Sequence, residues 1–105
     1  MPRYAFRLRI RADAIDEYEH EHTRVWPEML ASLKTAGISE YSIFRHGQDL
    51  FLYMHADDFD RAWQQLAGDP VNQRWQTFMA RLFEPVPDSK PGEPFAMMKE
   101  VFYLE

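Results

Sequence analysis

In "EYSIFRHGQDLFLYMHA", residues 40–56, two strand-like runs flank a turn. The runs cover residues 40–45 and 50–56, and the glycine within "HGQD" is typical of a β-hairpin connection. The second run contains "LFLYM", which is apolar on both faces, whereas an antiparallel strand in a small protein usually has one polar face. One face can pack against helices, so the other face needs a second cover, most simply another copy of the chain.

Upstream of this hairpin, the sequence predicts a strand followed by a long helix. Large apolar residues occupy every second position of residues 4–10, which is the pattern of a half-buried strand. Asp13 is expected to cap the helix, and apolar residues then recur every three or four positions as far as Leu33. Because this stripe keeps its register across Pro27, we expect a kinked or briefly interrupted helix that ends at Gly37.

Downstream of the hairpin, the sequence predicts two more helices and a last strand. Residues 57–68 open with two aspartates and close with glycine, and residues 69–82 open with an Asp-Pro pair, which is a typical helix start. Residues 84–94 carry four of the seven prolines and are predicted to form a loop. The terminal "MMKEVFYLE", residues 97–105, is predicted to be the final strand, again apolar on both faces.

The order strand, helix, strand, strand, helices, strand predicts an α+β fold. We expect a ferredoxin-like antiparallel sheet with helices on one face, in a single domain over residues 1–105. Because two strands are apolar on both faces, we also expect a dimeric α+β barrel, a homodimer packed sheet to sheet.

The composition excludes several classes of function. The net charge of −5 argues against nucleic-acid and anionic-membrane partners, which would require a basic face. The chain has no cysteine, hence no disulfide, thiolate metal site or cysteine nucleophile. The N-terminus alternates arginine with apolar residues, unlike a signal peptide, and no apolar run approaches the roughly 18 residues of a membrane span. We therefore expect a soluble, cytoplasmic protein.

The helical stripe carries the side chains best suited to chemistry. Tyr18, His22 and Trp26 follow each other at four-residue steps and face the sheet together. A histidine is well matched to proton transfer at neutral pH, and an indole suits the apolar face of a sugar. The alternative is that His22 is a core histidine whose ring nitrogens are hydrogen-bonded to neighbouring residues. Periodicity leaves both interpretations open. His20 lies about 200° from His22 around a helix, so this H-x-H pair does not indicate a metal site.

Several motifs together resemble the L-rhamnose mutarotase family. They are "EYEHEHTRVWPEML" at residues 17–30, Gly37, Tyr41, "QRW" at residues 73–75 and the terminal "EVFYL" at residues 100–104. The resemblance covers essentially the whole chain. It implies a small dimeric ferredoxin-like isomerase of rhamnose metabolism, which interconverts the α and β anomers of a 6-deoxy sugar pyranose without metal or cofactor.

The resemblance also implies the roles of individual residues. The family's proton-donor histidine falls on His22, and its sugar-binding tyrosines fall on Tyr18 and Tyr41. Its tandem aromatic pair falls on Trp75 and Gln76, where this chain has glutamine in place of a second tryptophan. Glutamine loses stacking area and offers a donor and an acceptor. L-Rhamnose is therefore the expected substrate and L-fucose the alternative.

Two other classes of protein share the expected fold. Small dimeric α+β-barrel monooxygenases have this size and element order, and a sugar-binding or interaction module could use the same ring-lined face without turnover. Fold alone does not separate these possibilities. The joint spacing of Tyr18, His22 and Tyr41 with the C-terminal motif favours the mutarotase.

Overall fold

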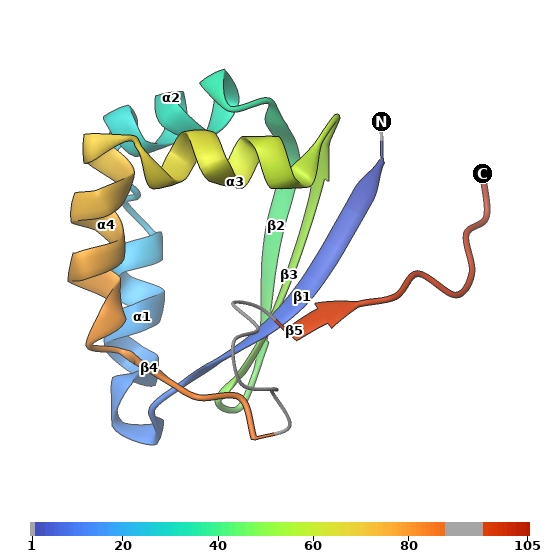
Figure 1. Cartoon of the computed structure of the whole chain (residues 1–105). Helices are drawn as coiled ribbons and strands as arrows, with labels where there is room; N and C mark the ends of the chain where they lie inside the picture. The colour runs from blue at the N-terminus through green and yellow to red at the C-terminus, as the bar shows by residue number, and fades with distance from the viewer. Residues whose placement is uncertain (1, 88–95) are drawn as a thin grey trace.

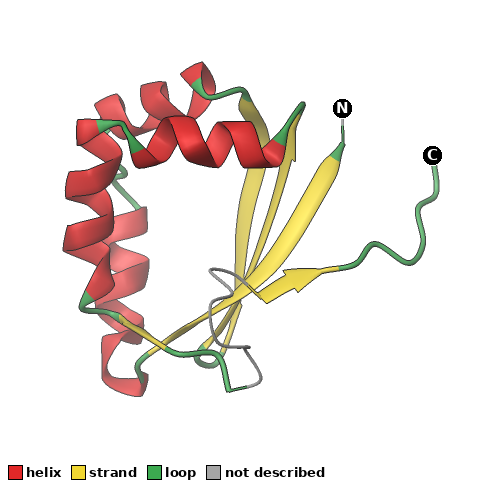
Figure 2. Ribbon diagram, in the orientation of Figure 1, coloured by secondary structure: helices red, strands yellow, loops and turns green. Residues whose placement is uncertain are grey.

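A computed structural model of the chain describes residues 2–87 and 96–105. An antiparallel sheet has the strand order β2-β3-β1-β4, with β5 also paired to β1. The helices all cover one face of the sheet (Figures 1 and 2), which confirms the predicted ferredoxin-like α+β arrangement. The elements follow each other in the order β1 (Arg3–Ile10), the 3₁₀ turn η1 (Ala12–Ala14), α1 (Ile15–His22), α2 (Pro27–Thr35), β2 (Ile38–His46), β3 (Asp49–Ala56), α3 (Phe59–Ala67), α4 (Pro70–Ala80), β4 (Phe83–Glu84) and β5 (Ala96–Met98).

The hairpin predicted around "HGQD" is confirmed as β2 and β3, both slightly longer than expected. Gly47 in the connection has a φ of +61°, a backbone conformation that glycine adopts without steric cost. β3 also pairs with β1, so that it lies in the middle of the sheet.

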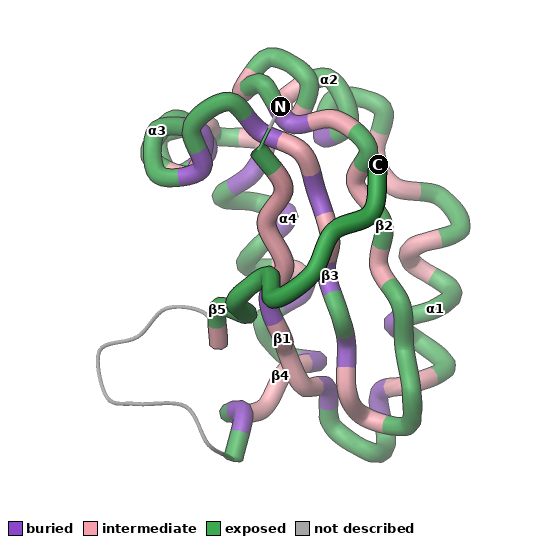
Figure 3. The backbone as a smooth tube through the Cα atoms, turned by 90° about the vertical axis from the view of Figure 1, so that its right-hand side faces the viewer, coloured by how far each residue is buried: buried purple, intermediate pink, exposed green. Residues whose placement is uncertain are grey.

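The register of the sheet gives β3 two different apolar faces. Leu50, Leu52 and Met54 are buried beneath the helices, whereas Phe51 lies on the outer face opposite Phe44. Figure 3 shows this alternation of burial along β3. Phe44 is 62% exposed and Phe51 is 37% exposed, so the prediction that "LFLYM" is apolar on both faces is confirmed, and the described residues leave both phenylalanines exposed on the outer face.

The long helical stripe is divided between two helices. α1 ends at His22 and α2 begins with Pro27 in its first turn, which confirms a brief interruption at the proline. Proline disfavours helical dihedral angles in the residue before it, and Trp26 accordingly has an extended ψ of 132°. Gly37 follows α2 with a φ of +88° and donates its amide to the Lys34 carbonyl at 3.0 Å, as expected for a glycine that ends a helix.

The helix caps were predicted with mixed success. The expectation that Asp13 caps α1 is wrong: Asp13 lies in the 3₁₀ turn and pairs with Arg11 at 3.1 Å, while the cap position, Ala14, makes no side-chain hydrogen bond. Asp58 and Asp69 do cap α3 and α4, each accepting a hydrogen bond from a backbone amide in the first turn. An N-cap side chain acts on its nearest backbone amides, but the 3₁₀ turn before α1 moves the helix start by one residue.

The C-terminal strand is shorter than predicted. Only Ala96–Met98 forms β5, and the chain after it leads away from the sheet without regular structure (Figure 1). The short β4, on the same side of β1, was not predicted. The predicted loop over residues 84–94 lies mostly outside the described residues.

Side chains, not a backbone ladder, hold the last residues near β1. Arg3 donates to both carboxylate oxygens of Glu100, at 2.7 and 3.1 Å, and its guanidinium lies 3.4 Å from the ring centroid of Tyr103. Phe102 and Leu104 remain 79% and 80% exposed. The predicted apolar character of this segment is therefore present, but nothing in the described chain covers it.

Candidate active site

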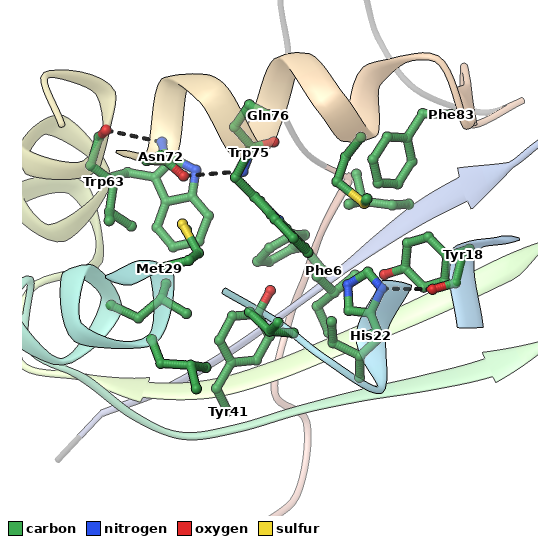
Figure 4. A pocket seen from close by; sticks show the side chains of 18 of the residues that line it. Phe6, Tyr18, His22, Met29, Tyr41, Trp63, Asn72, Trp75, Gln76 and Phe83 are labelled. Carbon is green, nitrogen blue, oxygen red and sulfur yellow. Dashed lines mark hydrogen bonds between the residues drawn. The ribbon is translucent and has the colours of Figure 1, made fainter. Parts of the chain in front are cut away.

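A cavity of about 430 Å³ lies between the inner face of the sheet and the helices. This volume is within the range of small-molecule sites, which are mostly apolar with a few polar groups. The lining is apolar on the sheet side, from Phe6, Leu8 and Leu52, and polar side chains reach it from α1, β2 and α4 (Figure 4). The polar lining residues are Tyr18, His22, Tyr41, Asn72 and Gln76.

His22 is held in one tautomer by its own helix. Its Nδ1 lies 2.8 Å from the carbonyl oxygen of Tyr18, and because a carbonyl can only accept, Nδ1 carries the proton. In the neutral ring Nε2 is then the unprotonated nitrogen, turned away from that carbonyl (Figure 4). Burial lowers the pKa of His22, an effect that the Tyr18 carbonyl only partly opposes. The site thus holds an imidazole that is mainly neutral near pH 7.

Two tyrosines supply hydroxyl groups to the same cavity. The ring of Tyr18 stacks on His22 with centroids 4.1 Å apart, and Tyr41 projects from β2 on the sheet side. Burial raises the pKa of both tyrosines, with a smaller contribution at Tyr41 from the nearby Tyr18. Both hydroxyls therefore stay protonated at neutral pH and can donate hydrogen bonds.

Trp75 forms an aromatic wall beside the imidazole. Its ring meets His22 edge-on at 5.6 Å and Trp26 edge-on at 5.0 Å. Trp26 in turn stacks on Phe78 at 5.8 Å and is not part of the cavity lining. Trp75 and Trp63 therefore both offer an indole to the cavity, and Trp26 supports Trp75 from behind.

Two amide side chains one turn apart on α4 complete the polar lining. Gln76 donates from Nε2 to Asn72 Oδ1 at 3.2 Å, and Asn72 donates from Nδ2 to the Leu66 carbonyl at 2.9 Å. Asn72 is buried and was not anticipated from the sequence. Its position four residues before Gln76 on an amphipathic helix was the signal that could have identified it.

A family model described as L-rhamnose mutarotase matches residues 3–104 of the chain. The chain belongs to the L-rhamnose mutarotase family. An L-rhamnose mutarotase from Salmonella newport is 35% identical over 106 residues, an alignment that covers 100% of both proteins. The crystal structure of an L-rhamnose mutarotase from Formosa agariphila has a TM-score of 0.81 and 31% identity, over 100% of both chains. The resemblance read from the sequence is confirmed, and with it the assignment to the isomerases.

The fold extends beyond the mutarotase family. Tetracenomycin F2 cyclase from Streptomyces glaucescens, a type-II polyketide cyclase, has a TM-score of 0.63 at 20% identity, covering 100% of this chain and 97% of that one. At this level of identity the likeness concerns the fold alone. The same scaffold therefore carries different chemistry in different families.

The structure brings together every residue that the mutarotase resemblance implied for the site. Tyr18, His22, Tyr41, Trp75 and Gln76 all line the one cavity, although they come from α1, β2 and α4. Their roles as catalytic and sugar-binding groups stay predictions.

The other histidines lie elsewhere. His20 and His46 are exposed, and His55 accepts or donates a hydrogen bond at 2.9 Å with Tyr53 on the outer face of the sheet. In the part of the chain that is described, no three histidine, cysteine, aspartate or glutamate side chains group closely enough to hold a metal ion. No helix among these residues is long and apolar enough to cross a membrane.

Proposed function

We propose that this chain interconverts the α and β anomers of L-rhamnopyranose, with His22 as the group that moves protons. One observation carries the proposal: Nδ1 of His22 is committed to the Tyr18 carbonyl, so that the neutral ring keeps a basic Nε2 within a cavity of monosaccharide size. The family membership makes mutarotation the expected reaction, and the cavity supplies the groups that the reaction requires.

Mutarotation proceeds by opening and closing the sugar ring. Opening removes the proton of the anomeric hydroxyl and delivers a proton to the ring oxygen as the bond between C1 and that oxygen breaks. The resulting aldehyde rotates, and closing on its other face reverses both proton transfers. His22 Nε2 accepts or returns one of these protons, and the protonated hydroxyls of Tyr18 and Tyr41 hold or supply the other by hydrogen bonding.

The remaining predicted residues bind the sugar. The indole of Trp75 offers an apolar surface to the C–H face of the pyranose, and Gln76 offers polar atoms to its hydroxyls. Positioned acid–base catalysis supplies about 10²- to 10⁴-fold, or roughly 3–5 kcal/mol of barrier. Because free sugars already mutarotate slowly in water, this gain is sufficient.

The first test is anomer exchange measured by saturation-difference NMR on equilibrated L-rhamnose and L-fucose. We expect exchange of L-rhamnose to be accelerated by the protein. Faster exchange of L-fucose would make L-fucose the preferred substrate. This is the alternative raised by Gln76, which stands where the family has a second tryptophan. No acceleration of either sugar by folded protein would contradict the proposal and favour a binding module or a monooxygenase of the same fold.

We also propose that the working form is a homodimer packed through the outer faces of two sheets, as expected for a dimeric α+β barrel. Phe44, Phe51 and Met98 share that face, and their exposure would make an apolar patch of the kind that marks protein interfaces. A single mutarotase-like domain over residues 1–105, a cytoplasmic location and the absence of nucleic-acid and membrane partners stay predictions from the sequence.

The dimer gives a direct prediction. Light scattering after size exclusion is expected to show twice the mass of one chain, and Phe44→Glu is expected to shift the protein toward monomer because it places a charge in the interface. Gln64→Glu adds the same charge on the exposed side of α3 and should leave the mass unchanged. A wild-type monomer at every concentration would contradict the proposal.

A further inference from the structure

The amide pair on α4 has a fixed direction of hydrogen bonding. The Leu66 carbonyl near the end of α3 can only accept, so Asn72 must present its NH₂ group to it, at 2.9 Å. This orientation turns Asn72 Oδ1 toward Gln76. Because Oδ1 can also only accept, Gln76 must donate from Nε2, at 3.2 Å. One backbone carbonyl therefore determines the orientation of both side-chain amides.

The consequence is an acceptor of fixed orientation at the edge of the cavity. Asn72 is only 9% exposed, whereas Gln76 is exposed and still lines the cavity. One N–H of Nε2 is engaged by Asn72, and Gln76 Oε1 receives no hydrogen bond from the described residues. Without Asn72, a glutamine at this position could present either end of its amide.

We infer that Gln76 Oε1 accepts a hydrogen bond from the C3 or C4 hydroxyl of the sugar, and that Asn72 is the positioning residue that fixes this acceptor. The inference rests on the proposed mutarotase function. In Figure 4 the ring of Trp75 lies between the amide pair and His22. A pyranose with its anomeric carbon and ring oxygen at His22 directs C3 and C4 away from the imidazole, toward the side where Gln76 lies.

This arrangement gives the pocket a rule of selectivity. An acceptor held in one direction favours a sugar with a hydroxyl directed toward it and disfavours one that lacks this hydroxyl. L-Fucose differs from L-rhamnose in the orientation of hydroxyls at C2 and C4, so a C4 contact would distinguish the two sugars directly.

The test compares kcat and KM for anomer exchange of L-rhamnose in wild type and Gln76→Leu. We expect KM to rise roughly 3- to 10-fold, the range for one net hydrogen bond, with kcat preserved. A hydroxyl remote from the anomeric carbon is bound equally in the ground and transition states, which predicts this split. Gln64→Leu, the same change on the exposed side of α3, should leave both constants unchanged.

Deoxy sugars identify the hydroxyl. For the wild type, KM should rise by a similar factor with either 3-deoxy- or 4-deoxy-L-rhamnose in place of L-rhamnose. For Gln76→Leu, KM should be the same for that deoxy sugar as for L-rhamnose. If removal of either hydroxyl raised KM equally in wild type and in Gln76→Leu, the proposed contact would be overturned.

A double-mutant cycle tests the role of Asn72. Asn72→Ala should raise KM about as much as Gln76→Leu, and the double variant should raise it no further, because the two residues act as one unit. Asn72→Ser, which keeps a small polar side chain, provides the same comparison if the alanine variant does not fold. If the KM increases of the two single variants combined fully in the double variant, the positioning role of Asn72 would be overturned.

The outcomes separate this inference from the function on which it rests. Active wild type with an unchanged KM in Gln76→Leu would overturn the inference and leave the mutarotase function intact. Wild type inert on both L-rhamnose and L-fucose would overturn the function, and the inference with it.

Discussion

His22→Ala is expected to lower protein-catalysed anomer exchange by about 10²- to 10⁴-fold, the range that positioned acid–base groups contribute. Among the described residues that line the cavity, Nε2 of His22 is the only imidazole nitrogen with a free lone pair, since Nδ1 donates to the Tyr18 carbonyl. The tyrosines cannot replace it, because burial raises their pKa and keeps them protonated. Exchange is measured by saturation-difference NMR with each variant at the same concentration.

His20→Ala is the matched control for this experiment. His20 lies two residues earlier on the same helix but is exposed, so its loss should leave exchange unchanged. Circular dichroism should show that both variants are folded. Activity of His22→Ala close to that of wild type would show that another group carries the proton.

The pH dependence separates two roles of the imidazole. Burial lowers the pKa of His22 below its ordinary 6.5, so neutral His22 predominates at pH 7. If neutral Nε2 begins the reaction as a base, kcat/KM should be level near pH 7 and fall only below pH 6.5. A rise toward acid pH would instead show that the protonated ring is the form required. His20→Ala should keep the wild-type profile.

Folding stability, like kcat/KM, should decrease at acid pH. Because the unfolded ring takes up a proton at a higher pH than the folded one, the contribution of His22 to stability is unchanged above pH 6.5 and decreases as pH falls below it. The acid limb of the activity profile must therefore be measured at pH values where the protein remains folded.

Leu50→Ala is expected to destabilise the fold by about 2–5 kcal/mol, the cost of a buried Leu-to-Ala cavity. Leu50 is 0% exposed and lies in β3, between β1 and β2, where it pairs with Leu8 and Arg45. The loss is large against the roughly 5–15 kcal/mol that stabilises a typical domain. Chemical denaturation measures it, at one fixed protein concentration because dimerisation would couple to unfolding.

The same substitution at Leu30 provides the comparison. Leu30 in α2 is 47% exposed, so Leu30→Ala should cost about 1 kcal/mol or less. Equal effects of the two substitutions would contradict the assignment of Leu50 to the core.

Local sequence patterns determined most of the framework. The alternation in β1 and β3, the glycine turn at Gly47, and the caps at Asp58 and Asp69 each depend on a few neighbouring residues. These features therefore predicted the order of elements and the apolar outer face of β3. The helical spacing of Tyr18 and His22 also placed both side chains toward the sheet, as the structure shows.

The site as a whole required the tertiary structure. Tyr41 and His22 share a cavity only because β2 lies beneath α1, and no spacing in the sequence predicts that distance. Trp26 follows the same stripe as His22, yet the break before Pro27 moves it behind Trp75. The bond from Asn72 to the Leu66 carbonyl spans only six residues, but it depends on the angle at which the short connection sets α4 against α3.

Residue order alone predicted the helices, the first three strands, their apolar faces and the family, because burial of one face imposes a regular spacing of apolar residues. The extent of the C-terminal strand depends on the fold of the whole chain, since a strand needs a paired neighbour and the chain departs from β1 after Met98. The folded chain also shows which ring nitrogen of His22 is free and how the Gln76 amide is oriented, because the first depends on the Tyr18 carbonyl and the second on the Leu66 carbonyl.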